Sequence, residues 1–248
     1  MGINVRLVST HFNHDMKSLK LHSLLLSILA LHACSSQVYN NKSYLKAHNL
    51  AGKRIAVLPA EVELTGKLPS NYSLEKKYQI EESESKSIQR QIFSQYLYKS
   101  KSKSKKSAVE LMNVDQINSK LQQAGISLRE SWSIDPDSLA RLVGADMVLK
   151  IRVKKNRMMS ESAAFGIGVA TTVLGNILNN SDRNNTSVGT SAKTYNMFFD
   201  ATLTDAVSHV VITRFSHEGA ASWNQSPEQI IESSGRKIVR KGAVYAQN

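Results

Sequence analysis

Alternating apolar and polar residues predict two long β-strands in the second half of the chain. The first covers 147–154, where the apolar residues Met147, Leu149, Ile151 and Val153 alternate with Val148, Lys150, Arg152 and Lys154. A second alternation covers 195–204. A repeat of two places alternate side chains on opposite faces of a sheet. Shorter apolar or β-branched runs predict three more strands, at 53–59, 108–112 and 210–215.

Apolar residues at helical spacing, with suitable start and stop residues, predict four helices. The first spans 85–99, with Ile88 and Ile92 on its apolar face. The second and third begin after the cap residues Asn113 and Asp135, and end at Gly125 and Gly144. The last opens at Ser226-Pro227 and carries Ile230, Ile231, Ile238 and Val239. The intervening segments 61–84 and 99–106 are expected to be loops.

This order of elements predicts an α/β (α+β) fold in which helices flank a mixed sheet. We expect one domain over 51–248, with an insertion at about 158–192. The sequence contains no internal repeat.

The first 33 residues have the pattern of an export signal. Met16 is followed by two lysines and then by the apolar run 24–31, which is too short for a permanent membrane-spanning helix. We therefore expect 1–33 to be a signal peptide that is removed. Translation is expected to start at Met16, because residues 1–15 carry Asp15 and two histidines, which are unusual in such a leader.

The end of this leader, Leu31-His32-Ala33-Cys34, resembles the lipobox of bacterial lipoproteins. The resemblance implies cleavage before Cys34 and attachment of lipid, palmitate included, to that cysteine. Ser35 rather than aspartate follows the cysteine, which by the same resemblance implies sorting to the outer membrane. The polar residues of 34–50 are expected to form a tether.

The charge of the chain limits the kinds of partner. The net charge is +12, and +10 remains after Arg6, Lys17, Lys20 and Asp15 leave with the leader. Such a surface favours phosphates, anionic lipid or nucleic acid. An exported protein seldom meets nucleic acid, so we expect no nucleic-acid partner. The basic run 99–106 is expected to be a solvated loop, with lipopolysaccharide phosphates or anionic headgroups as the alternative contact.

Candidate catalytic and metal-ligating residues are few. The single cysteine excludes an intramolecular disulfide and a cysteine-rich metal site. His48, His209 and His217 remain after the leader, without further metal ligands nearby in the sequence, and are expected at the surface. Gly166-Ile-Gly168 lacks the third glycine of a dinucleotide-binding motif. We therefore expect no enzyme activity, no catalytic residue, no metal and no cofactor.

Several segments together resemble a family of envelope lipoproteins. It includes the curli secretion lipoprotein and the penicillin-binding-protein activators, whose core is similar to the amino-terminal domain of TolB. The resembling segments are 54–59, 114–125, 139–149, and 203–205 continuing to 210–212. Ser208-His209 stands where the family has a glycine. The resemblance implies a TolB-N-like domain without catalytic residues.

The insertion contains sixteen uncharged residues with three glycines, 163–178, followed by a polar stretch to Ser191. The curli secretion lipoprotein has a membrane-spanning hairpin at this place. Here the outgoing arm, 184–193, is polar, so an apolar helix that packs on the protein, on lipid or on a second copy is favoured.

The sequence therefore predicts an outer-membrane-anchored lipoprotein that faces the periplasm. We expect it to act through contacts with envelope proteins in assembly or secretion, with self-association as a further possibility. The alternative is a component of an oligomeric membrane pore that uses the insertion.

Overall fold

A computed structural model describes residues 37–69, 72–100, 109–160, 193–222 and 225–246. The expected signal peptide, Cys34, the apolar segment 163–178 and most of the basic run 99–106 lie outside these residues. The elements are β1 (Gln37–Asn40), α2 (Lys42–Ala47), β2 (Arg54–Val57), β3 (Glu61–Gly66), α3 (Leu74–Ser100), β4 (Glu110–Leu111), α4 (Val114–Gln123), α5 (Leu128–Ser133), α6 (Pro136–Val143), β5 (Met147–Arg157), β6 (Lys193–Asp205), β7 (Val211–Ser222), α8 (Pro227–Lys241) and α9 (Ala243–Ala246).

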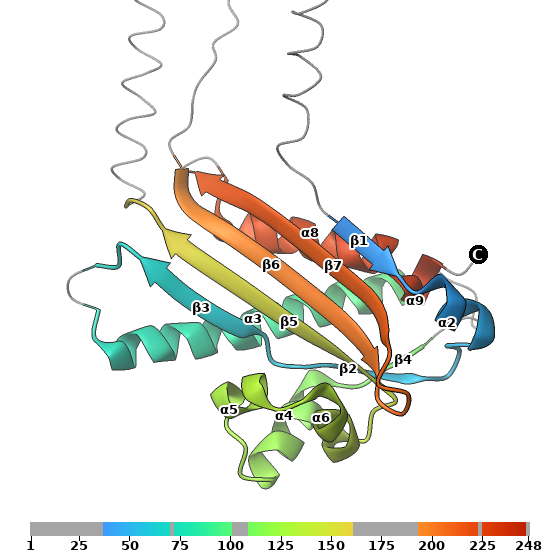
Figure 1. Cartoon of the computed structure of the whole chain (residues 1–248). Helices are drawn as coiled ribbons and strands as arrows, with labels where there is room; N and C mark the ends of the chain where they lie inside the picture. Colours follow the sequence, from blue (N-terminus) through green and yellow to red (C-terminus); the bar gives the residue numbers. More distant parts are fainter. Residues whose placement is uncertain (1–36, 70–71, 101–108, 161–192, 223–224, 247–248) are drawn as a thin grey trace, which may run out of the picture. The chain divides into compact units, whose positions relative to one another are not determined.

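The strands form one mixed sheet in the order β1-β7-β6-β5-β2-β4, and β3 continues along β5 beyond β2 (Figure 1). The strands β2, β3 and β4 belong to the parallel part, whereas β5, β6, β7 and β1 pair antiparallel. Helices α3 and α8 cover one face, and α4, α5 and α6 cover one end of the other (Figure 1). The predicted fold class, helices flanking a mixed sheet, is confirmed.

The core lies mainly between the sheet and the helices α3 and α8. Leu149, Ile151 and Val153 of β5 are buried there with Ile231 and Ile238 of α8, as their alternation predicted. A second cluster joins the other face of β2 and β5 to α4 and α6. No helix among the described residues is long and apolar enough to cross a membrane.

The predicted helix ends are confirmed where local chemistry sets them. Asn113 and Asp135 cap α4 and α6 with their side chains, and Ser226 forms a capping box with Gln229 at the start of α8. Gly144 ends α6 with φ at 75°, in the left-handed region that favours glycine.

The prediction of a loop over 61–84 is wrong. Val62 and Leu64 are buried in β3, and α3 begins at Leu74, well before the predicted start at Ser85. The early turns of α3 bury polar side chains, Glu81 and Ser85, so no apolar stripe marks them. Glu81 accepts the backbone N–H of Leu64 at 2.8 Å and an Arg129 guanidinium bond at 2.6 Å, which satisfies its buried carboxylate.

The segment 37–50 differs from the expected tether. Residues Gln37–Asn40 pair antiparallel with β7, and Asn41 caps α2 with its side chain. Tyr44 and Leu50 are buried in the core. The strand partner is more than 170 residues away in sequence, so the polar composition of this segment gave no sign of the pairing.

Candidate functional site

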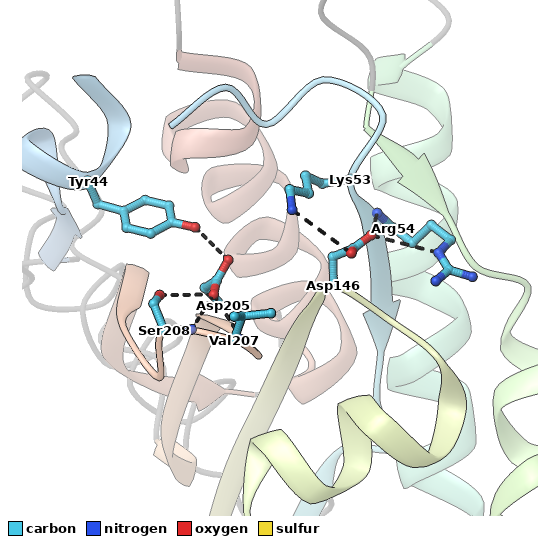
Figure 2. A network of polar contacts seen from close by, with 7 residues as sticks. All are labelled: Tyr44, Lys53, Arg54, Asp146, Asp205, Val207 and Ser208. Carbon is cyan, nitrogen blue, oxygen red and sulfur yellow. Dashed lines mark hydrogen bonds and ion pairs between the residues drawn. The ribbon is translucent and has the colours of Figure 1, made fainter. Parts of the chain in front are cut away.

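The chain that leads in from Cys34 is fixed to the sheet at the β6–β7 turn. Tyr44 donates its hydroxyl to Asp205 Oδ2 at 2.5 Å (Figure 2). The other carboxylate oxygen accepts bonds from the Ser208 N–H at 2.7 Å, the Ser208 hydroxyl at 2.9 Å and the Val207 N–H at 3.0 Å. Residues 161 positions apart are thus joined by one buried hydrogen bond.

Charge and burial reinforce this junction. Burial alone would raise the pKa of Asp205, but the hydrogen bonds from Tyr44, Ser208 and Val207 outweigh it and lower that pKa. Burial, together with the neighbouring Asp205 carboxylate, raises the pKa of Tyr44. The folded state therefore holds a neutral phenol on an ionised carboxylate, which is a charge-assisted hydrogen bond.

Asp146 forms a second junction beside the first. It lies just before β5, and its carboxylate accepts the Arg54 N–H at 2.8 Å (Figure 2). Its ion pairs with Arg54 and Lys53 are longer, at 3.7 and 4.0 Å. Its carbonyl accepts the Ala206 N–H at 2.9 Å. Both aspartates use their oxygens to hold strand ends together, which is a structural role.

The three histidines do not converge. His48 stacks on Tyr44 with ring centroids 4.2 Å apart, and His209 contacts Asp137 through Nδ1. These two are exposed, as predicted, whereas His217 is half-buried on β7. Burial, and then Lys237, lower the pKa of His217. Among the described residues, no group of three potential ligands could hold a metal ion.

His209 has an unusual backbone. Its φ is 59°, and it stands at the position where the resembled family has a glycine in the turn. A left-handed backbone is uncommon for a residue other than glycine, and here the His209 side chain contacts Asp137.

The outer face of the sheet over β3, β5, β6 and β7 is covered by none of the described helices (Figure 1). Charged side chains on this face form cross-strand ion pairs: Arg152–Glu61 at 2.6 Å, Lys154–Glu63 at 3.0 Å and Arg214–Asp200 at 3.0 Å. The first two pairs join the parallel strands β3 and β5, and the third joins the antiparallel strands β6 and β7. The alternation in the sequence predicted which side chains lie on this face. Which cation meets which carboxylate depends on the strand register, which the sequence pattern does not give.

The border of this face lies at Lys150. Its ammonium group donates to the carbonyls of Trp132 and Ile134, both at 2.8 Å, and so ties β5 to the end of α5. Burial lowers the pKa of Lys150. The face is a candidate surface for protein contacts, because it combines paired charges with the exposed ring of Tyr39 at its β1 edge.

No protein-family model matches the sequence, and no curated protein matches it. Solved structures with some similarity include the PelC dodecamer from Paraburkholderia phytofirmans, at 9% identity and a TM-score of 0.39, with 83% of this chain and 95% of that chain covered. A lipoprotein of Neisseria meningitidis has 11% identity, a TM-score of 0.39, and coverage of 76% and 96%. The LpoB C-terminal domain from Escherichia coli has 15% identity, a TM-score of 0.30, and coverage of 71% and 90%. Similarity at this level identifies neither a family nor a function.

Proposed function

We propose that this protein is held to the outer membrane by lipid on Cys34, faces the periplasm, and acts by binding envelope proteins rather than by catalysis. One observation carries the proposal. The first described strand, β1, starts at Gln37, three residues after the cysteine of the lipobox-like sequence.

Covalent geometry makes this spacing informative. An extended chain advances at most about 3.6 Å per residue, so three residues span about 10 Å. Gln37 is paired with Ser216 of β7, and the segment that follows is fixed by Tyr44. A lipid on Cys34 would therefore hold the domain directly at the bilayer, where its surfaces meet membrane-associated partners.

The outer face of the sheet supports binding rather than chemistry. The carboxylates Glu61, Glu63 and Asp200 there are engaged by cations of neighbouring strands. Tyr39 is 54% exposed at the edge of the same face. Tyrosine and arginine are enriched in protein interfaces, and both occur here.

A second candidate function is a component of an oligomeric membrane pore. The connection 161–192 joins strand ends that are already paired: Arg157 lies opposite Tyr195, and the Met158 N–H donates to the Thr194 carbonyl at 2.8 Å. The two ends of this connection are therefore fixed side by side in the sheet. A pore requires a closed ring of copies, so the mass of the detergent-solubilised protein separates the two functions.

The test has an anchor arm and a partner arm. In growing cells, Cys34→Ser should abolish incorporation of labelled palmitate and leave uncleaved precursor. In the second arm, a photo-crosslinking residue at Arg214, on the outer face, should capture a discrete envelope protein, whereas the same residue at the exposed Arg90 of α3 should not. Normal labelling of the cysteine variant would refute the anchor, and equal capture at both positions would refute the outer face as the binding surface.

A further inference from the structure

One end of the sheet gathers cations that form ion pairs with none of the described carboxylates. The strand ends meet there, because the Lys67 N–H donates to the Arg157 carbonyl at 2.8 Å and the Met158 N–H donates to the Thr194 carbonyl at 2.8 Å. We call this end the tip and define its cations as Lys67, Lys76, Arg157 and Lys193.

The tip differs in charge from the rest of the sheet. Along its middle, cations such as Arg152, Lys154 and Arg214 each face a carboxylate of a neighbouring strand. Among the described residues, none of the four tip cations makes an ion pair. Lys76 and Arg157 instead lie over the rings of Tyr72 and Tyr195, at 5.2 and 5.9 Å from the ring centroids. Glu75 offsets one of the four charges and Glu228 is paired with Lys155, so the described residues leave the tip positive.

Apolar side chains are exposed among these cations. Leu74, at the start of α3, is 63% exposed, and Met158, just beyond β5, is 40% exposed. Cations mixed with exposed apolar side chains are the composition that binds the headgroup layer of an anionic bilayer.

The start of β1 is the end of that strand nearer to the tip. Because β1 is antiparallel to β7, its first residue, Gln37, is the β1 residue closest to Ser222 at the tip. Gln37 is level with Ser216, about 20 Å short of the end of β7 at about 3.3 Å per residue. Three residues span at most about 10 Å, and β1 runs from Gln37 away from the tip, so the end of β1 that follows Cys34 in sequence faces the tip rather than the β6–β7 turn.

We infer that the tip docks on anionic phospholipid headgroups, with Lys67, Lys76, Arg157 and Lys193 contacting lipid phosphates and Leu74 and Met158 entering the interface. The inference rests on the proposed lipid anchor. Docking of the tip would fix the orientation of the domain on the membrane. The β6–β7 turn with Val207 would then point away from the bilayer, and the outer face of the sheet would lie roughly perpendicular to the membrane surface.

A second basic surface is the alternative docking site. Arg240 and Lys241 end α8 at the opposite end of the sheet, where the Lys241 carbonyl accepts a bond from Asn40. Cations in the last turn of a helix already offset its dipole. The Lys241 carbonyl contacts Asn40, the last residue of β1, whereas the tip lies beyond its first residue, Gln37, which follows the anchor residue in sequence; the tip is therefore favoured.

The single cysteine of the chain allows a direct test on the lipidated protein. With Cys34 occupied by lipid, Met158→Cys or Val207→Cys supplies one free thiol for an environment-sensitive fluorophore. Val207 is the matched control, since it is exposed and apolar but lies in the β6–β7 turn. The protein is placed in vesicles of phosphatidylethanolamine and phosphatidylglycerol that contain a nitroxide-headgroup lipid, and quenching is compared with vesicles of phosphatidylcholine.

We expect quenching at position 158 but not at 207, and only in the anionic vesicles. Lys67→Gln and Lys193→Gln should each lower the ratio of docked to undocked protein about fivefold, the value for removing one cation near an anionic surface. Equal quenching at both positions, or loss of docking with Arg240→Gln and Lys241→Gln instead, would overturn the inference. If the fluorophore reacted with Cys34 in the wild-type protein, that cysteine would carry a free thiol. The proposed lipid anchor would then be wrong, independently of whether the tip docks.

Discussion

The hydrogen bond between Tyr44 and Asp205 should set the stability of the N-terminal junction. The substitution Tyr44→Phe keeps the ring that stacks on His48 and removes only the hydroxyl. The Asp205 oxygen that it contacts at 2.5 Å then remains buried without that donor. A hydrogen bond to a charged group contributes about 1.5–3 kcal/mol. The second oxygen keeps its bonds to Ser208 and Val207, so we expect a loss of about 2 kcal/mol at neutral pH.

The effect should depend on pH in a defined direction. The folded-state pKa of Asp205 is lowered, so its contribution is present above the unfolded value of about 3.9 and is lost as pH falls through the folded value. The folded-state pKa of Tyr44 is raised, so its contribution is present below the unfolded value of about 10 and is lost as pH rises beyond it. The difference between wild type and Tyr44→Phe should be flat between these limits and smaller outside them.

Urea unfolding at several pH values measures the difference in free energy of unfolding between wild type and Tyr44→Phe. Hydrogen exchange shows which part of the domain loses stability. Protection of the amides of 37–47 should fall in the variant, while that of β5 should change less. Tyr39→Phe is the control, since Tyr39 is exposed and should change stability by less than about 0.5 kcal/mol. A loss at Tyr44 no larger than the control, or one independent of pH, would refute the role assigned to this bond.

Three further predictions concern the core, the insertion and a helix end. Leu149→Asp, between β2 and β6, should cost more than about 4 kcal/mol, because it buries an unpaired charge; an ordinary thermal melt would contradict this, and Asn196→Asp on the exposed outer face is its control. Replacing 160–190 by a short Gly/Ser linker should leave the domain folded, because the flanking strands are paired up to Arg157 and Tyr195; sedimentation and liposome flotation should show loss of self-association or of membrane contact beyond the anchor, and unchanged behaviour would refute a role for the segment. Gly144→Ala should cost about 1 kcal/mol in urea unfolding, because φ at 75° disfavours a side chain; an unchanged midpoint would show that the turn relaxes.

Local chemistry was sufficient to predict some elements. The caps Asn113 and Asp135 and the terminal glycine of α6 are read from neighbouring residues, and the structure has each of them in that role. The strand β5 was predicted because every second residue from Met147 to Val153 is apolar, and these residues are buried. These signals act within a few residues, so no tertiary information was needed.

The missed features depend on contacts between distant residues. The first turns of α3 bury Glu81 against Arg129, 48 residues away, so a polar stretch became part of a packed helix. The short helix α5 was missed although its capping box, Ser127 with Glu130, could have indicated it. The Tyr44–Asp205 bond and the unpaired cations of the tip required the strand register, which the sequence pattern does not specify.

The position of the junction also bears on how an anchored domain would carry load. A force applied to the first residue of β1 along its strand axis would be shared in shear by its four residue pairs with β7. Behind them, the Asn41 N–H donates to the Ile212 carbonyl at 2.9 Å, and Tyr44 is fixed to Asp205 at the opposite end of the sheet. The Tyr44–Asp205 hydrogen bond follows β1 in the chain. It would therefore keep the segment attached to the sheet after the first β1–β7 pairs had separated. Three residues separate Cys34 from Gln37 and span at most about 10 Å, so little slack in the chain would separate a lipid on that cysteine from the first strand.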